Sequence, residues 1–443
     1  MTRLRILPFC VLLLVPVACG SSGSATKQLA RPPDCRHPER ESAIRATYCG
    51  SYKRIRGGGK APTHPVRRRV PKVPCKVRVE EYFYAATNWL TLTKALARRA
   101  SPCAQYYISI PPIQDAEGAW VLSRPKEPDI IHAFGPQFHA MAEVNTWPWG
   151  EWVQDTGKSW YDAGVLARER MGNAGYKPEL GDIWAVNEFP LALTTSKGQQ
   201  KAMTEFVHGL YDGSSKDPKI RGLIWKVAEF QTSSNLGSWR KDLESWFAES
   251  SFWKDMGKYV RSWSAEVYAD PIASCPVGSP FLRDANSVAA YLEHIPQLVQ
   301  AGSSKVAAAR SYLEQAYTPL ANAAWQWNYG FGITTIPVEQ MQRFVSLQTY
   351  GIAAFAKAHP VLTKPVRIGF GWAPKNTTGL EAGRFHDGNH KVADALAKSI
   401  ANAFRPDGIF PKRACGKDGR RCRCQVRGAK LNPGWLRFVA GRG

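Results

Sequence analysis

The chain has 443 residues, of which 44% are hydrophobic and 16 are tryptophan, a composition typical of a folded body with a large buried core. The formal net charge is +23, but residues 79–410 contain 32 Lys/Arg and 32 Asp/Glu, so the excess positive charge lies in the two flanks. A central body without net charge argues against nucleic acid as a partner.

Residues 1–25 predict an export signal. Arg3 and Arg5 precede an apolar run over residues 6–18, which is too short to cross a bilayer comfortably. The sequence before Cys19 partly resembles a bacterial lipobox but has Pro16 where an aliphatic residue is usual. We therefore expect a secreted or cell-surface protein, either released by cleavage or attached to lipid through Cys19.

Residues 26–78 predict a basic linker rich in Pro and Gly. Residues 53–78 contain ten Lys/Arg and no acid, which suits either a solvated spacer or an attachment to an anionic cell wall or membrane surface. Cysteines outside the leader are even in number, which in an exported chain predicts disulfides of open connectivity. They are Cys35, Cys49, Cys75, Cys103, Cys275, Cys415, Cys422 and Cys424.

Between residues 79 and 410, short apolar segments alternate with helical sequence. The eight strand candidates are 79–88, 106–113, 138–145, 183–188, 222–230, 259–268, 324–334 and 366–372. Such alternation predicts a parallel sheet with crossover helices, and eight repeats favour an α/β (β/α)8 TIM barrel. The long interval 270–323 predicts an insertion between the sixth and seventh strands. An open doubly wound sheet is the alternative, although no Gly-rich phosphate loop follows the first strand.

Residues 411–443 predict a small, basic, Cys-rich appendage. Asp418 and Gly419 provide a turn between cysteines, which is typical of a hairpin pinned by disulfides. The Cys422 and Cys424 pair is an alternative metal site, but no fourth ligand lies nearby. No cofactor is expected, because the chain contains no cofactor motif and its histidines, including His132 and His139, lack metal-ligand spacing.

Four glutamates end four consecutive strand candidates: Glu143, Glu188, Glu229 and Glu266. In a barrel these ends meet at one mouth, so we expect the four acids to face one cavity. Aromatic residues crowd the same strand ends and predict a lining for sugar rings. They are Trp147, Trp149, Trp263, Trp327, Tyr329 and Trp372. Cleavage of a glycosidic bond needs one protonated and one ionised carboxyl group, which this set of residues would supply.

Val186, Asn187 and Glu188, followed by Pro190, resemble the Asn-Glu pair that ends the fourth strand in a large group of (β/α)8 glycoside hydrolases. The resemblance implies that Glu188 is the acid/base and that Asn187 binds the 2-hydroxyl of the sugar. This chain departs from that group on the predicted seventh strand, which offers no acid before Glu339. Three explanations stay open: another acid replaces the nucleophile, a distant base acts through water, or the fold binds glycans without cutting them.

These patterns together predict an exported barrel that acts on a polysaccharide or oligosaccharide, with Glu188 as acid/base and Glu266 as nucleophile or base. Glu229 is a less favoured replacement, and both Glu143 and Glu229 suit a structural ion pair as well as a substrate contact. Candidate cations for such pairs are Lys226, Arg261 and Arg367. The alternatives are a glycan-binding barrel without activity and a barrel enzyme of different chemistry.

Overall fold

The structure is a computed structural model that describes residues 74–85, 89–110, 113–114, 120–121, 127–187, 196–228, 250–267, 307–318, 320–322, 333–335, 338–359, 365–372, 390–411 and 430–431. Nine strands form one sheet in the order β10-β12-β1-β2-β5-β6-β7-β8-β9. They are β1 (Val79–Ala85), β2 (Ala104–Ile110), β5 (Phe138–Asn145), β6 (Ile183–Asn187), β7 (Gly222–Ala228), β8 (Val260–Val267), β9 (Tyr317–Thr318), β10 (Leu320–Asn322) and β12 (Val366–Trp372).

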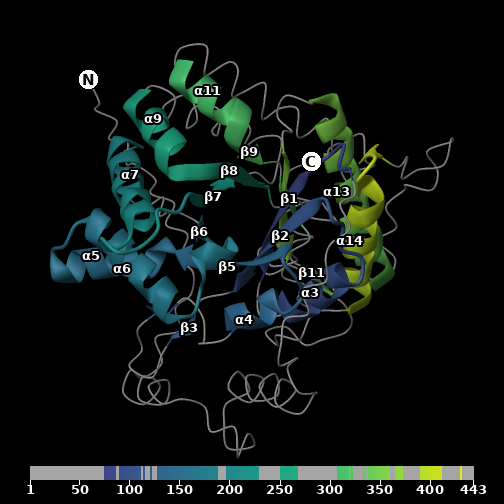
Figure 1. Ribbon diagram of the computed structural model, residues 1–443, viewed down its shortest axis with the longest axis horizontal. Coiled ribbons are helices and arrows are strands. Elements are labelled where there is room, and N and C mark those ends of the chain that lie inside the picture. Colours follow the sequence, from purple (N-terminus) through teal and green to yellow (C-terminus); the bar gives the residue numbers. More distant parts are fainter. Residues whose placement is uncertain are drawn as a thin grey trace, which may run out of the picture.

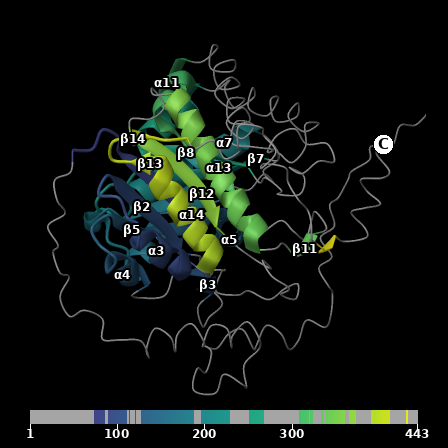
Figure 2. The same ribbon diagram turned by 90° about the vertical axis from the view of Figure 1, so that its right-hand side faces the viewer.

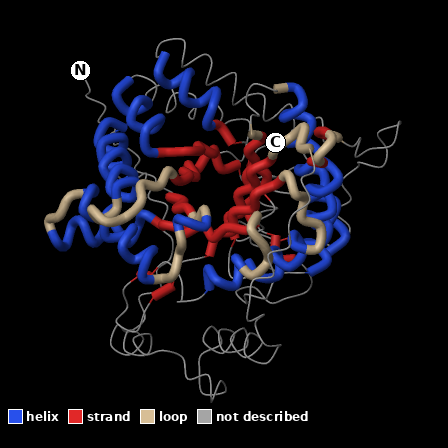
Figure 3. Tube along the Cα trace, in the orientation of Figure 1, coloured by secondary structure: helices blue, strands red, loops and turns tan. Residues whose placement is uncertain are grey.

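The sheet curls into an almost closed barrel. Every pairing within it is parallel, and β9 pairs with β8 while β10 pairs with β12. Since one residue separates β9 from β10 in the chain, this short stretch joins the two edges of the sheet. Figure 3 shows the resulting ring of strands with helices around it. The prediction of a TIM-barrel-like α/β fold is therefore confirmed, and an open sheet is excluded.

The helices form an outer layer around the strands (Figure 1). They are α3 (Trp89–Ala97), α4 (Glu127–His132), α5 (Thr146–Thr156), α6 (Trp160–Asn173), α7 (Ser196–Asp212), α9 (Ser250–Tyr259), α11 (Ala307–Ala316), α13 (Val338–Ala358) and α14 (His390–Ala403). A 90° turn shows α13 beside α14 (Figure 2). Local sequence sets some boundaries: Ser159 and Asp162 form a capping box that starts α6.

Two glycines let α6 and α7 approach each other closely. A Cβ atom on Gly164 would lie 2.2 Å from the backbone oxygen of Phe206, and one on Gly209 would lie 2.2 Å from that of Tyr161. Neither distance is tolerable for a real Cβ, so the two backbones meet only because both positions are glycine.

The pleat of each strand divides the sheet into an interior and an outer face. Tyr82, Tyr107 and His139 occupy matching positions on β1, β2 and β5, and their rings stack inside the barrel. The residues before Tyr107 and His139 face the helices, where the Tyr106 and Phe138 rings stack. Alternation with period two therefore decides which side chains reach the interior.

Seven of the eight strand predictions are confirmed. The prediction that residues 324–334 form the seventh barrel strand is wrong, and residues 324–332 lie outside the described part of the chain. The barrel position between β8 and β12 is filled by β9 and β10, upstream of the predicted segment 324–334. The end of that segment belongs to β11 (Ile333–Thr335), which pairs antiparallel with β15 (Lys430–Leu431) in a separate sheet. The aromatic segment has the stronger β propensity, whereas the strand that closes the ring is short and interrupted by a proline.

Short antiparallel pairs and one disulfide complete the described fold. The pairs are β3 (Ile113–Gln114) with β4 (Trp120–Val121), and β13 (Phe404–Arg405) with β14 (Gly408–Ile409). Cys75 and Cys103 are bonded, which ties the chain before β1 to the turn before β2. The other predicted disulfide cysteines, the export signal, residues 26–73 of the linker and most of the tail lie outside the described residues. In the part that the structure describes, no helix is long and apolar enough to cross a membrane.

Candidate functional site

Glu143 lies on the interior face of the barrel near its carboxyl end. It is the sixth of eight residues in β5, and its side chain is buried, with 5% of the residue exposed. The Ser109 hydroxyl on β2 donates a 2.7 Å hydrogen bond to Glu143 Oε2. Because a buried carboxylate without partners is costly, this bond is part of what makes the position tolerable.

Asn187 is the last residue of β6, and its position in the strand belongs to the same face of the sheet as Glu143. The register pairs Glu143 with Ala185, two residues before Asn187. On the other side, Asn187 pairs with Trp225 of β7. The fourth strand therefore ends with the Asn of the predicted Asn-Glu pair at an interior position.

Glu266 occupies an interior position near the end of β8. Its backbone pairs with Val227, and it shares a face of β8 with Ser262 and Ser264, whose buried side chains contact Thr318 of β9. Glu266 is the seventh of the eight residues of β8, so it lies at about the same point along its strand as Glu143 does in β5. The backbone thus brings three of the predicted site positions to one end of one interior.

Other predicted site residues lie at the edge of what the structure describes. Trp147 is the second residue of α5, and Trp372 is the last residue of β12. Glu188 follows β6 directly and Glu229 follows β7 directly, but both lie outside the described residues, as do Trp327 and Tyr329.

Two of the predicted tryptophans belong to the outer layer. Trp149 on α5 is 3% exposed and packs against Phe206 of α7, with the Arg170 guanidinium 5.0 Å from its ring. Trp263 of β8 is 4% exposed and packs against Trp253 of α9. Since protein covers both rings, neither offers a face to a sugar in this structure. The alternation of side chains along β8 explains why Trp263 faces the helices, because its neighbours Ser262 and Ser264 take the interior positions.

The amino end of the interior holds a charged cluster that the sequence did not reveal. Glu80 of β1 accepts hydrogen bonds from Arg261, Arg367 and the Tyr82 hydroxyl. Burial alone would raise the pKa of Glu80, but the two guanidinium groups and the hydroxyl hold it below its ordinary value. Arg261 and Arg367, which were candidate partners for acids at the mouth, are therefore committed to the opposite end.

Aromatic rings continue this cluster across the barrel. The Arg261 guanidinium lies 5.5 Å from the centre of the Tyr107 ring, which stacks between Tyr82 and His139. Nitrogen atoms of His139 contact the Leu180 carbonyl at 2.8 Å and the Gln105 side-chain amide at 2.6 Å. Burial lowers the pKa of His139, so the ring is neutral at physiological pH.

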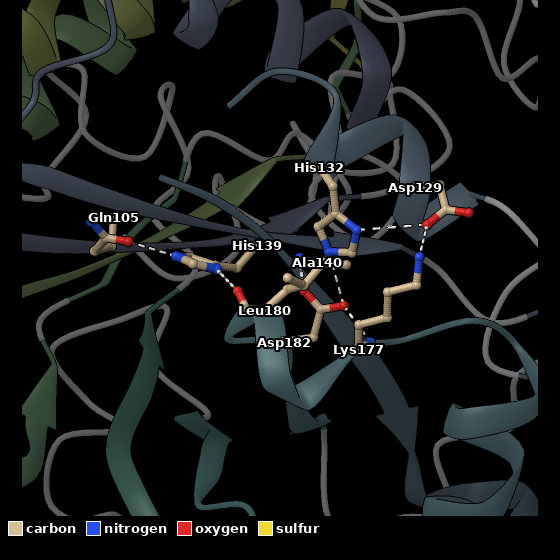
Figure 4. A network of polar contacts seen from close by, with 8 residues as sticks. All are labelled: Gln105, Asp129, His132, His139, Ala140, Lys177, Leu180 and Asp182. Carbon is tan, nitrogen blue, oxygen red and sulfur yellow. Dashed lines mark hydrogen bonds and ion pairs between the residues drawn. The ribbon is translucent and has the colours of Figure 1, made fainter. Parts of the chain in front are cut away.

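A second polar network links the amino ends of β5 and β6 to α4 (Figure 4). The fully buried Asp182 carboxylate accepts from the backbone nitrogens of Ala140 and Lys177 and contacts His132 Nε2 at 2.8 Å. The Lys177 ammonium in turn pairs with Asp129 at 2.6 Å. His132 and His139 therefore take part in hydrogen-bond networks that link neighbouring elements. Within the described residues, no three His, Cys, Asp or Glu side chains lie close enough together to hold a metal.

Fold and site together define a parallel α/β barrel with carboxylate and amide positions gathered at its carboxyl end. No protein-family model matches the chain, and no curated protein matches it. Among solved structures, the chain is similar to the apo crystal structure of endo-beta-N-acetylglucosaminidase from Cordyceps militaris. The TM-score is 0.34 and the identity 9%, over 74% of this chain and 91% of that one. So distant a likeness says nothing about the chemistry of this chain.

Proposed function

We propose that the protein is an exported carbohydrate-active barrel that hydrolyses glycosidic bonds with carboxylates at the carboxyl end of the barrel. One observation carries the proposal. By the strand register, the positions of Glu143, Asn187 and Glu266 are on the interior face near the carboxyl ends of β5, β6 and β8, within a run of four neighbouring strands. Chemistry in this fold is placed at that end of the barrel.

Strand spacing is compatible with a pair of catalytic carboxylates. β7 alone separates β6 from β8. Neighbouring strands lie about 4.8 Å apart, so the ends of β6 and β8 are about 10 Å apart. Hydrolysis with retention needs carboxyl groups about 5 Å apart, and hydrolysis with inversion needs about 6.5 to 9.5 Å. Side chains that extend from β6 and β8 toward the barrel axis fall within this span.

In the proposed mechanism Glu188 protonates the leaving oxygen, Asn187 binds the adjacent sugar hydroxyl, and Glu266 acts as nucleophile or as base for water. The alternation of side chains along β6 affects the direction of Glu188. In an uninterrupted strand the position after Asn187 would share the outer face with Trp184 and Val186. Glu188 therefore serves this role if the backbone turns inward after β6.

A panel of polysaccharides tests the proposal with wild type, Glu188→Gln and Glu266→Gln. We expect each variant to lose at least about 100-fold in kcat, the usual contribution of a positioned acid or base. Glu179→Gln is the control, because Glu179 is exposed and lies before β6. Turnover by Glu188→Gln and Glu266→Gln at the wild-type rate would remove these residues from the mechanism.

One observation favours a second function, the binding of glycans without hydrolysis. The seventh barrel position is filled by β9 and β10, whose sequence contains no acid. The glycoside hydrolases that the chain resembles place their nucleophile on that strand. Saturable binding of a glycan by wild type, without any reducing ends released, would select this function.

The location and the other partners complete the proposal. The leader directs the protein out of the cytoplasm, and the basic flanks at 26–78 and 411–443 hold it near an anionic cell wall or membrane surface. Extraction of the native protein with high salt or with detergent distinguishes an electrostatic attachment from a lipid anchor at Cys19.

A further inference from the structure

We propose that one side of the amino end of the barrel, from β7 round to β1, is a docking face for an anionic lipid surface. Docking through this side turns the carboxyl end, with the proposed site, away from the membrane. The inference rests on the proposed attachment of the basic flanks to an anionic surface, and it names the face of the barrel that makes the contact. It does not depend on hydrolysis.

Positive charge is concentrated on this side, which we call the basic face. It consists of the segments that lead into β7, β8, β12 and β1, together with the β13–β14 hairpin: residues 212–222, 257–261, 365–367, 74–80 and 404–410. These segments contain nine Lys/Arg and only four Asp/Glu, so the basic face has an excess of positive charge. Six of the cations are exposed and precede the strands: Lys76, Arg78, Lys216, Lys219, Arg221 and Lys258.

Hydrogen bonds between the segments make the basic face continuous. The Arg221 guanidinium donates to the Gly257 and Val260 carbonyls at 2.9 and 2.8 Å, so the chain before β7 lies against the chain before β8. Lys258 stands between these two carbonyls in the chain, so two exposed cations lie close together here. Because carbonyl oxygens are neutral acceptors, these bonds leave the positive charge of Arg221 in place.

The basic face continues across the interior to β1. Arg261 of β8 and Arg367 of β12 both pair with Glu80 of β1, so two guanidinium groups share one carboxylate and one positive charge remains. With 31% of its side chain exposed, Arg261 reaches solvent at this end of the barrel. The Val366 nitrogen donates to the Arg78 carbonyl at 2.9 Å, which places the exposed Arg78 beside the start of β12.

The other side of the amino end lacks this excess. The segments that lead into β2, β5 and β6 are residues 98–105, 133–139 and 174–183, and they contain only three Lys/Arg. Each of the three pairs with an acid of an outer helix: Arg98 and Arg99 with Asp394 of α14, and Lys177 with Asp129 of α4. The excess positive charge therefore belongs to one side of the amino end and not to the whole of it.

The basic linker joins the barrel at the basic face. The disulfide of Cys75 with Cys103 holds the chain before β1, and the Lys76 nitrogen next to it donates to the Pro406 carbonyl at 2.8 Å. Residues 53–73, which precede this point in the sequence, contain eight Lys/Arg and no acid. The linker and the basic face can therefore meet the same anionic surface.

The distribution of the cations favours a lipid surface over a single polymer chain. Lys216 and Lys258 lie outside the ring of strands, whereas Arg261 and Arg367 lie inside it, so the charges cover an area and not a line. A bilayer presents anionic headgroups over a plane, and each Lys or Arg near such a surface strengthens binding about fivefold.

The test measures how tightly the full chain binds vesicles of phosphatidylcholine mixed with phosphatidylglycerol, with vesicles of phosphatidylcholine alone as the neutral reference. The triple variant Lys216→Gln/Lys219→Gln/Lys258→Gln removes three charges from the part of the basic face that lies outside the basic flanks. It should weaken binding to the anionic vesicles about 100-fold. All three lysines are exposed, so thermal melts of the variant should match those of wild type.

A matched control removes the same charge from exposed lysines that lie in or next to α6, α7 and α14, outside the basic face: Lys158→Gln/Lys201→Gln/Lys398→Gln. Since salt screens charges that lie far from the membrane, this variant should bind within about twofold of wild type.

The outcomes separate the docking face from the attachment itself. If the first triple variant binds the anionic vesicles as tightly as wild type, the docking face is wrong and attachment through the flanks stands. Equal weakening by both triple variants also overturns the docking face, because net charge alone then explains binding. If wild type binds soluble polyglycerol phosphate but not the vesicles, the lipid surface is wrong and a wall polymer takes its place. None of these results bears on hydrolysis, which the polysaccharide panel tests.

Discussion

The two ends of the barrel interior hold buried glutamates with different partners. At the amino end, Glu80 pairs with Arg261 and Arg367, which balance the charge of the acid within the protein. At the carboxyl end, Glu143 accepts a hydrogen bond from the Ser109 hydroxyl. Two acids of similar burial therefore have different surroundings, so burial alone does not mark a functional acid.

Further contacts strengthen the amino end. The Asp182 network ties α4, β5 and the chain before β6 together (Figure 4), and the disulfide of Cys75 with Cys103 fixes the entry to β1. In barrels of this kind the amino end is associated with stability and the carboxyl end with chemistry. Variants that separate unfolding from activity can therefore test whether the two ends differ in this way.

The largest effect is expected at Glu80. Glu80→Ala leaves two guanidinium groups without their carboxylate and should lower the free energy of unfolding by about 3 to 5 kcal/mol, toward the lower end because 31% of the Arg261 side chain is exposed. Glu143→Gln keeps an acceptor for Ser109 and should cost about 1 kcal/mol or less. Urea denaturation measures both changes, and equal losses of unfolding free energy would show that the two acids contribute alike to stability.

Removal of the disulfide should have the next largest effect. Cys75 and Cys103 are separated by 28 residues, and a closed loop of that length stabilises a fold by about 3 kcal/mol. The double variant Cys75→Ser/Cys103→Ser should lose that amount under oxidising conditions, while kcat stays unchanged below the melting temperature. A loss of kcat without a change in stability would mean that the amino end takes part in chemistry.

A substitution in the outer helices, away from both ends of the interior, serves as a reference for the stability measurements. Gly164→Ala places a Cβ against the backbone of α7 and should cost about 1 to 3 kcal/mol. Gly172 lies on the same helix with open space around it, so Gly172→Ala should be neutral or stabilising by up to about 1 kcal/mol. Thermal melts distinguish the two variants, and similar melting temperatures would contradict the close contact of α6 and α7.

The smallest effect is a dependence on pH at Glu81, which follows Glu80 but faces the outer layer. Burial raises the pKa of Glu81 well above its ordinary value, and its Oε2 atom makes no hydrogen bond. Tyr106, on the neighbouring strand, is a titratable group that interacts with it. The folded state therefore binds this proton more tightly than the unfolded state, whose pKa is about 4.3.

The sign of the effect follows from this difference in proton binding. The contribution of Glu81 to stability is greatest below the unfolded pKa and falls as the pH rises toward the folded pKa, by at most about 1.4 kcal/mol per pH unit. Glu81→Gln does not titrate, so the free energy of unfolding of wild type, relative to this variant, should fall between pH 5 and pH 6. A constant difference across that range would show that Glu81 is ionised in the fold.

The sequence determined most of the barrel, because local periodicity and β propensity set where strands occur. Seven strand candidates coincide with strands, and the alternation along β5 and β8 already implies which residues share a face with Glu143 and Glu266. The seventh position could not be read in this way. Two short strands around a proline fill this position, because they pair with β8 on one side and with β12 on the other. Closure of the ring, and not local β propensity, therefore determines which segment lies there.

The partners of each acid depend on tertiary contacts. Glu80 lies 181 residues from Arg261 and 287 from Arg367, so no sequence spacing reveals that these three side chains converge. Likewise, the outward direction of Trp263 depends on where β8 pairs with its neighbours. Residue types limit which chemistry is available, but the distances between an acid and its partners arise when strands far apart in the chain are brought together in one closed sheet.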